Sequence, residues 1–149
     1  MILIDNENSN LLRDKYVDKF INKFSSYYFN NIQHLKKYSD GLYYSGYLWD
    51  CLQKPNVISE SKADCILQGK KNIYIMWDLH SNDKVLIPNY WKFPKNSILY
   101  YEKWFADCKE ELPEDIYVFD DSFNWSVIYT HEELKPGKRY CLYIDKTIK

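Results

Sequence analysis

The spacing of apolar positions at the start of the chain indicates an amphipathic helix. From Leu12 the apolar residues recur every three or four positions, which predicts a helix that ends near Asn30–Asn31. Asn10 or Ser9 is available as the N-cap. The predicted apolar stripe consists of Leu12, Tyr16, Phe20, Phe24 and Tyr27 or Tyr28. The basic residues expected to face outward are Arg13, Lys15, Lys19 and Lys23.

Two more helices are predicted further along. Ser59 and Ser61 precede "KADCIL", and Gly69 supplies a left-handed stop, which predicts a helix of about nine residues. A third helix is expected over Ser97–Glu111, before Leu112-Pro113. The pattern of "LYYSGYLWDCL", which follows the Asp40-Gly41 turn signal, does not distinguish strand from helix.

Runs of alternating β-branched and aromatic residues predict the strands. "NIYIMWDL" and "KVLIP" form one predicted pair, joined by "HSND". "DIYVF" and "NWSVIYT" flank "DDSF" and predict an antiparallel hairpin over Asp115–Thr130. After a turn at Pro136-Gly137, a last strand is expected over Tyr140–Ile144. In that strand Tyr140, Leu142 and Ile144 should share one face, opposite Cys141 and Tyr143.

This order of elements predicts the fold class. The 149 residues suit one domain, and 15 Tyr, 7 Phe and 5 Trp imply a well-filled core. We expect a single α+β domain over residues 1–149, with a mainly antiparallel sheet and about three helices packed against one side of it.

The N-terminal sequence, the lengths of the apolar runs and the cysteine spacing indicate the cellular compartment. The N-terminus "MILIDNENSN" lacks the pattern of a secretory signal, and no apolar run is long enough to span a membrane, so the sequence predicts a cytoplasmic protein. The widely separated cysteines predict four reduced and mostly packed thiols, with no zinc site or disulfide: Cys51, Cys65, Cys108 and Cys141.

Two histidines are the candidates for catalysis. His80 follows Asp78 by two positions and His131 precedes Glu132, so a metal site or a general acid–base pair would form if the two strand ends met. A Cys141 nucleophile with His131 as its base is a weaker alternative. In the simpler interpretation each ring only packs and bonds to a neighbour. We therefore expect no cofactor and no bound metal.

Several function classes are disfavoured. None of the phosphate-binding, nucleophile-elbow or zinc-protease motifs occurs, and 4 glycines make a phosphate-cradling loop improbable. The aromatic residues would suit single-stranded nucleic acid, but the acidic residues around the aromatic hairpin repel phosphate.

Charge is distributed unevenly along the chain. Between Asp107 and Glu133 there are nine acids against one base, a local net charge of −8, while the whole chain carries −1. Such a pole speeds the encounter with a basic partner, although a solvated edge that keeps the protein in solution is the competing interpretation.

The stretch "LPEDIYVFDDSFNWSVIYTHEE", with "GYLWDCL" before it and "RYCLYI" after it, resembles a group of small, largely uncharacterised bacterial proteins whose aromatic, acidic hairpin ends in Thr-His-Glu. Similar acidic-faced proteins serve as immunity proteins of toxin systems. The resemblance implies a non-enzymatic, immunity-type inhibitor that binds a toxin. The acidic pole predicts that this toxin has a basic surface, such as the substrate cleft of a nuclease, and the charge and hydropathy patterns predict binding to neither nucleic acid nor a membrane. The residues expected to contact the partner are Asp120, Asp121, Trp125, Glu132 and Glu133.

The alternative is a small hydrolase or metal-dependent enzyme that uses His80 and His131 with Asp78 or Glu132. The oligomeric state stays open.

Overall fold

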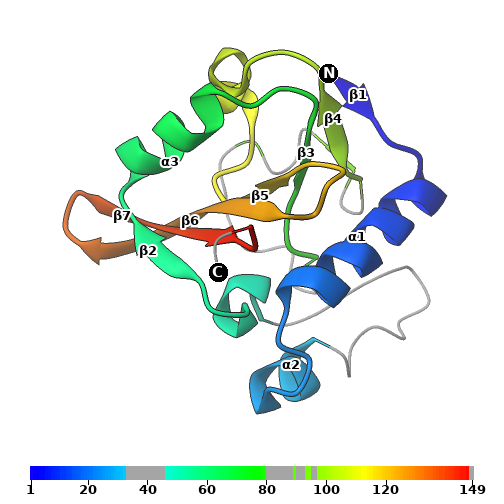
Figure 1. Ribbon diagram of the computed structural model, residues 1–149, viewed down its shortest axis with the longest axis vertical. Coiled ribbons are helices and arrows are strands. Elements are labelled where there is room, and N and C mark those ends of the chain that lie inside the picture. The colour runs from blue at the N-terminus through cyan, green and yellow to red at the C-terminus, as the bar shows by residue number, and fades with distance from the viewer. Residues whose placement is uncertain (33–45, 80–88, 90–92, 95–96, 148–149) are drawn as a thin grey trace.

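A seven-stranded antiparallel sheet organises the part of the chain that the structure describes (Figure 1). This computed structural model describes residues 1–32, 46–79, 89, 93–94 and 97–147. The strands lie in the order β1-β4-β3-β5-β6-β7-β2. Their bounds are β1 Ile2–Leu3, β2 Asn56–Ile58, β3 Ile73–Met76, β4 Leu99–Tyr101, β5 Ile116–Phe119, β6 Trp125–Lys135 and β7 Lys138–Asp145. The predicted α+β class with a mainly antiparallel sheet is confirmed.

The predicted hairpin forms the middle of this sheet. β5 and β6 pair with Ile116 opposite Tyr129 and Val118 opposite Val127. The Asp120 carboxylate accepts the backbone N–H of Ser122 in the connecting turn, at 3.0 Å. The last predicted strand is confirmed as β7, which pairs with β6, and its residues divide between the two faces as expected.

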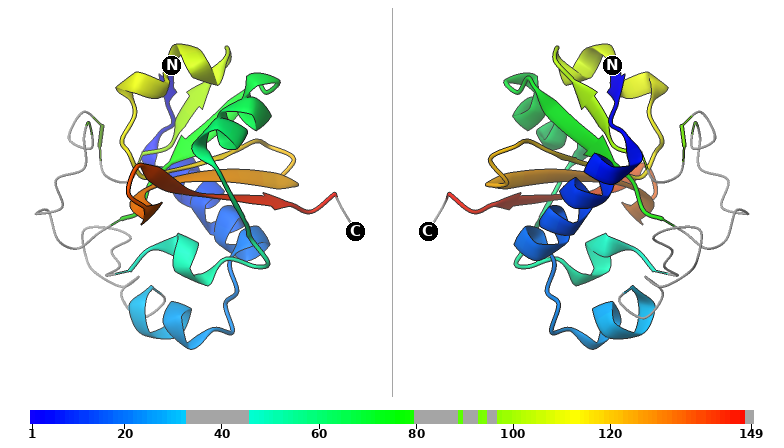
Figure 2. Two further views of the ribbon diagram at one scale, coloured as in Figure 1. Left: turned by 90° about the vertical axis from the view of Figure 1, so that its left-hand side faces the viewer. Right: turned by 90° about the vertical axis from the view of Figure 1, so that its right-hand side faces the viewer.

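Helices cover both faces of the sheet, whereas the sequence predicted one covered side. α1 (Asn6–Phe20) lies on one face and α3 (Glu60–Gln68) on the other (Figure 2). The reason is visible in β5, whose four residues are all buried: Tyr117 and Phe119 join the core under α1, while Ile116 and Val118 join the core under α3. A strand that is buried on both faces reads as a continuous apolar run, so "IYVF" in β5 carried the signal of two covered faces that the prediction of one covered side did not use.

The first helix is shorter than predicted and begins earlier. The Asp5 side chain accepts the N–H of Asn8 and caps α1, and the helix ends at Phe20. The chain is extended at the next residue and then starts a separate short helix, α2 (Ser26–Asn31). Phe24 lies in this connection with its side chain 100% exposed, so its place in the helical spacing did not reflect burial.

Arg13 is buried, contrary to the outward orientation predicted for it. Its side chain lies on the sheet-facing side of α1, and Nη1 donates to the carbonyl of Trp77 at 2.7 Å. This bond fastens α1 to the end of β3. A long side chain with an apolar stem can cross a core when its head finds a carbonyl acceptor, which residue type alone does not indicate.

The second helix is confirmed and the third is wrong. α3 has nine residues, and the Ser59 hydroxyl caps it by accepting the N–H of Lys62. The helix stops at Gly69 as expected, but Gly69 has φ −94° and not the predicted left-handed conformation. The segment predicted to be helical over 97–111 instead contains β4, which lies between β1 and β3, followed by two short 3-10 helices. The aromatic run "LWDC" within "LYYSGYLWDCL" is also a 3-10 helix, Leu48–Cys51. The predicted "KVLIP" strand lies outside the described residues.

Candidate functional site

The predicted contact residues lie at opposite ends of the β5–β6 hairpin. Asp120 and Asp121 belong to the turn, whereas Glu132 and Glu133 lie near the far end of β6. Glu132 lies seven positions along the strand from Trp125, a span of about 20–25 Å. The acidic residues therefore form separate groups on the surface and not one continuous pole.

The turn end of the hairpin is occupied by internal contacts. Asp120 accepts from the backbone and hydroxyl of Ser122 through one oxygen, and from the indole N–H of Trp125 through the other, at 2.9 Å. Trp125 is only 4% exposed, packs in the core under α3, and carries the Lys70 ammonium 4.8 Å from the centre of its ring. Its burial leaves it no free face for a partner. Asp121 remains exposed.

At the other end of the hairpin, a buried carboxylate holds His131. The ring Nδ1 lies 2.9 and 2.8 Å from the two carboxylate oxygens of Asp115, and the backbone N–H of His131 donates to the same carboxylate at 2.6 Å. The Asp115 side chain is 2% exposed and that of His131 is 36% exposed. Burial raises the pKa of Asp115, and the bonds from His131 offset part of that rise.

Two aromatic rings lie beside this pair. Tyr47 stacks on Trp49 with the ring centres 4.0 Å apart, and the His131 ring lies 5.6 Å from Tyr47 and 6.0 Å from Trp49. Burial, followed by the nearby carboxylates of Asp115 and Asp78, raises the pKa of Tyr47 to about 12. Tyr47 therefore stays neutral at physiological pH, and it cannot serve there as a phenolate base.

The Asp78 carboxylate accepts hydrogen bonds that hold neighbouring elements together. One carboxylate oxygen accepts the N–H of Leu48 at 3.0 Å and the other accepts the hydroxyl of Tyr117 at 2.7 Å, while the Tyr117 hydroxyl accepts the N–H of Trp49. This network joins the end of β3 to the 3-10 helix Leu48–Cys51 and to the middle of β5. It fixes the aromatic pair next to His131.

These contacts change which carboxylate would assist His131 in the enzymatic alternative. The carboxylate that meets His131 is Asp115, whereas Glu132 is exposed and Asp78 bonds elsewhere. His80 lies outside the described residues, so the proposed meeting of the two histidines stays a prediction. Within the described ranges, no group of His, Cys, Asp and Glu has a geometry that would hold a metal ion.

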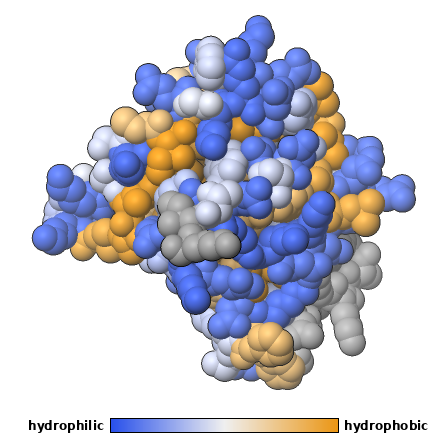
Figure 3. All heavy atoms as spheres, viewed as in Figure 1, coloured by the Kyte–Doolittle hydropathy of each residue, from blue (hydrophilic) through white to orange (hydrophobic). Residues whose placement is uncertain are grey.

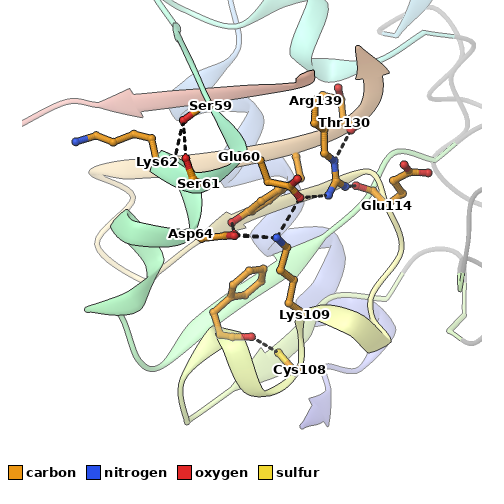
Figure 4. A network of polar contacts seen from close by, with 12 residues as sticks. Ser59, Glu60, Ser61, Lys62, Asp64, Cys108, Lys109, Glu114, Thr130 and Arg139 are labelled. Atoms are coloured by element: carbon orange, nitrogen blue, oxygen red, sulfur yellow. Dashed lines mark hydrogen bonds and ion pairs between the residues drawn. The ribbon is translucent and has the colours of Figure 1, made fainter. Parts of the chain in front are cut away.

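A cluster of charged side chains joins α3 to strands β6 and β7, on the face of the sheet that α3 covers (Figure 4). Glu60 binds the Lys109 ammonium at 3.1 Å and the Arg139 guanidinium at 2.7 Å. Asp64 binds Lys109 at 2.9 Å and accepts the hydroxyl of Tyr129 at 2.6 Å. The cluster pairs two acids with two bases and is therefore neutral. The residues of the cluster lie up to 79 positions apart in the sequence, so no local sequence pattern predicts that they meet.

Four other carboxylates at this end of the β5–β6 hairpin have no such partner, and one of them, Glu132, lies close to Tyr47 and Tyr140. Arg139 donates to the backbone carbonyl of Glu114 and lies opposite Glu133 across the β6–β7 pair. Glu110 and Glu114 line one cavity with Arg139, of about 280 Å³. We call the following group the acidic end: Glu110, Glu114, Glu132 and Glu133. In the described part of the chain none of their side chains forms an ion pair, and all are exposed except the half-buried Glu114.

The thiols agree with the prediction of reduced cysteines. All four are free, and three are buried: Cys51, Cys108 and Cys141. Burial raises the pKa of the Cys141 thiol to about 11, which disfavours its use as a nucleophile with His131. Within the described residues, no helix combines the length and apolar character that crossing a membrane requires.

Comparison with known proteins does not add a family to this description. No family model, no curated protein and no solved structure matches the chain. The functional argument therefore rests on the chemistry of the site.

Proposed function

We propose that the protein is a cytoplasmic, non-enzymatic binding protein that inhibits a bacterial toxin, in the manner of an immunity protein, by covering a basic surface of that toxin. The contact surface is the acidic end. The observation that carries this proposal is the contrast between two neighbouring groups of acids: Glu60 and Asp64 are neutralised by Lys109 and Arg139, while the four carboxylates of the acidic end are left unpaired.

Unpaired carboxylates of one sign repel one another, and binding to a basic surface relieves that repulsion. They also steer a basic partner during diffusion and disfavour acidic competitors. The β5–β6 hairpin holds three of them, because Glu114 lies two residues before β5 and Glu132 and Glu133 belong to the exposed end of β6. The acidic turn at Asp121 is left outside this surface because it lies at the other end of the hairpin.

The test is a growth assay with the toxin encoded beside this gene. Co-expression of the protein should restore growth, and the purified pair should form a complex. Glu133→Lys should slow association about tenfold in low salt and weaken its salt dependence. Asp121→Lys is the matched control, because it makes the same change in charge at the exposed far end, and it should alter the rate less than twofold.

Equal effects of the two reversals would overturn the assignment of the acidic end. Failure of the protein to bind the toxin or to restore growth would overturn the proposed function itself. Circular dichroism of both variants shows whether the fold is kept.

A second candidate function has one observation in its favour. Asp115 holds Nδ1 of His131 and the ring is 36% exposed, which is how a carboxylate orients a general base. Stoichiometry separates the two functions. An inhibitor abolishes toxin activity at one molecule per toxin, whereas an enzyme that modifies the toxin does so in substoichiometric amounts.

A further inference from the structure

The β6–β7 hairpin extends beyond the body of the sheet as a two-stranded arm (Figure 1). We call residues 131–138 the arm. Every residue in it is exposed. Its turn is Pro136-Gly137, where Gly137 has φ +79°, a left-handed conformation that favours glycine. Because its residues are all exposed, the ribbon contributes little to the core, and its length calls for another explanation.

One edge of β7 lacks a neighbouring strand at the base of the arm. β2 pairs with β7 from Asn56 opposite Tyr143 to Ile58 opposite Cys141. The chain then leaves the sheet, because Ser59 caps α3. Residues 138–140 of β7 continue past this point, and in the described part of the chain no strand pairs with them on the β2 side. Their outward backbone groups on that side are available to an extended segment.

A groove lies where β2 would have continued. It has a volume of about 480 Å³ and runs between the start of α3 and the arm. Its lining residues are Val57, Ile58, Ser59, Glu60, Ser61, Leu134, Lys135, Gly137, Lys138 and Arg139. The groove and the unpaired edge therefore coincide.

The side chains of the groove combine apolar surface with positive charge. Val57 is 54% exposed and Leu134 is 57% exposed, although both are large aliphatic residues. Figure 3 shows apolar surface alongside the arm, with hydrophilic side chains at its tip. Lys135 and Lys138 form no ion pair with any described residue, while Arg139 is bound to Glu60.

We propose that this groove binds an extended segment of a partner protein, rich in acidic and aliphatic residues, which adds to the sheet beside β7 in line with β2. The backbone of the segment bonds to residues 138–140, its aliphatic side chains cover Val57 and Leu134, and its carboxylates meet Lys135 and Lys138. The groove adjoins the acidic end, because Glu132 and Glu133 belong to the arm and Glu60 and Arg139 line the cavities on both sides. The proposal does not depend on the proposed function.

A second copy of this chain does not fit the same edge. Antiparallel pairing of two β7 edges about a two-fold axis near Arg139 would bring the basic residues of both copies together. Like charges opposite each other destabilise a strand pair, and lysine on an exposed edge is a common barrier to self-association. The occupant is therefore of opposite charge.

The test uses synthetic peptides with the intact protein. A capped hexapeptide in which valine alternates with glutamate should bind with a Kd of about 1 mM or tighter, and should shift the amide NMR signals of residues 138–140 and 57–58. The same peptide with lysine in place of glutamate should bind at least tenfold more weakly. N-methylation of alternate backbone nitrogens should abolish binding, because it removes the donors that strand addition needs.

A charge variant and its control complete the test. Lys138→Glu should weaken binding of the glutamate peptide about tenfold, whereas Lys19→Glu, an equal change on the exposed face of α1, should leave it within twofold. No binding of the glutamate peptide, equal binding of the N-methylated peptide, or signal shifts confined to other parts of the chain would each overturn the proposal. None of these outcomes bears on toxin inhibition through the acidic end.

Discussion

At the scale of single residues, the charge of a side chain did not determine whether it is buried or exposed. Asp115 counts as one of nine acids in an acidic stretch, yet it is buried and bound to His131. Arg13 belongs to a basic helix face by its type, yet it is buried against Trp77. In both cases a partner distant in sequence offsets part of the cost of burying a charged group, while Nε and Nη2 of Arg13 have no hydrogen-bond partner.

Trp125 provides a direct test of burial at this scale. Trp125→Ala should lower the free energy of unfolding by about 3–5 kcal/mol, because it removes a large side chain from the core under α3. Trp125→Phe keeps most of the volume and loses the indole bond to Asp120, so it should cost about 1–2 kcal/mol. Urea unfolding at 25 °C measures both. A change below about 1 kcal/mol in the alanine variant would contradict the buried position.

The four thiols should differ in reactivity. Cys65 is exposed on α3, while burial raises the pKa of Cys51 to about 12 and those of Cys108 and Cys141 to about 11. A colourimetric thiol reagent at neutral pH should therefore label one cysteine in the folded protein and all four in denaturant. The Cys65→Ser variant should show almost no fast reaction. Fast labelling of that variant would show that a second thiol is accessible.

At the scale of elements, α3 is held to the rest of the molecule by the cluster around Glu60. Lys109 comes from the segment before β5 and Arg139 from β7, so one carboxylate connects three elements. The cluster also contains Tyr129, since both cations lie near its ring, at 5.0 and 5.2 Å from the ring centre. Loss of the Glu60 charge should therefore loosen α3 and the base of the arm together.

Acid should weaken this connection. Burial acts to raise the pKa of Glu60, but the bonds from Arg139 and Lys109 outweigh it, and the net pKa is lowered from 4.5. A carboxylate whose pKa is lower in the folded state contributes stability that is present above its unfolded pKa and is lost as the pH falls through the folded pKa. Glu60→Gln should thus remove part of the stability difference between pH 7 and pH 3. Glu133→Gln, which removes an exposed and unpaired charge, is the matched control, and equal pH profiles for the two variants would contradict the role of Glu60.

The elements that the sequence predicted correctly share one property, which is that local signals agree with one another. In α3 a capping serine, a helical spacing and a terminal glycine coincide, and in the β5–β6 hairpin the alternation and the turn residues coincide. The predicted helix over 97–111 lacked such agreement. The apolar residues of Leu99–Tyr101 are compatible with a helix or a strand. Pairing with β1 and β3 makes this segment a strand.

At the scale of the whole molecule, two cores share the same central strands. Within β6, Ile128 belongs to the core under α1 and Val127 to the core under α3. Neither core can lose its packing without disturbing the strands that support the other. We therefore expect one cooperative unfolding transition.

Leu67→Ala tests this coupling. Leu67 is a fully buried residue of α3, and its truncation should cost about 2–5 kcal/mol. If the two cores unfold together, hydrogen exchange of the most protected α1 amides on the opposite face should accelerate by the same free energy. Leu134→Ala, in the exposed arm, should leave both measurements within about 0.5 kcal/mol. Unchanged protection in α1 would show that the two faces unfold separately.

The sequence by itself determined the class of the fold, the hairpin and its turn, the nine-residue helix α3 and the final strand. Each of these depends on contacts between residues close in the chain or on composition. Only the tertiary structure decided that helices cover both faces of the sheet, that Asp115 meets His131, that Lys109 and Arg139 neutralise Glu60 and Asp64, and that the acidic residues separate into two groups. These features depend on which strands become neighbours, in which register and with which face toward each helix. That choice minimises the free energy of the whole chain, and no single segment carries a record of it.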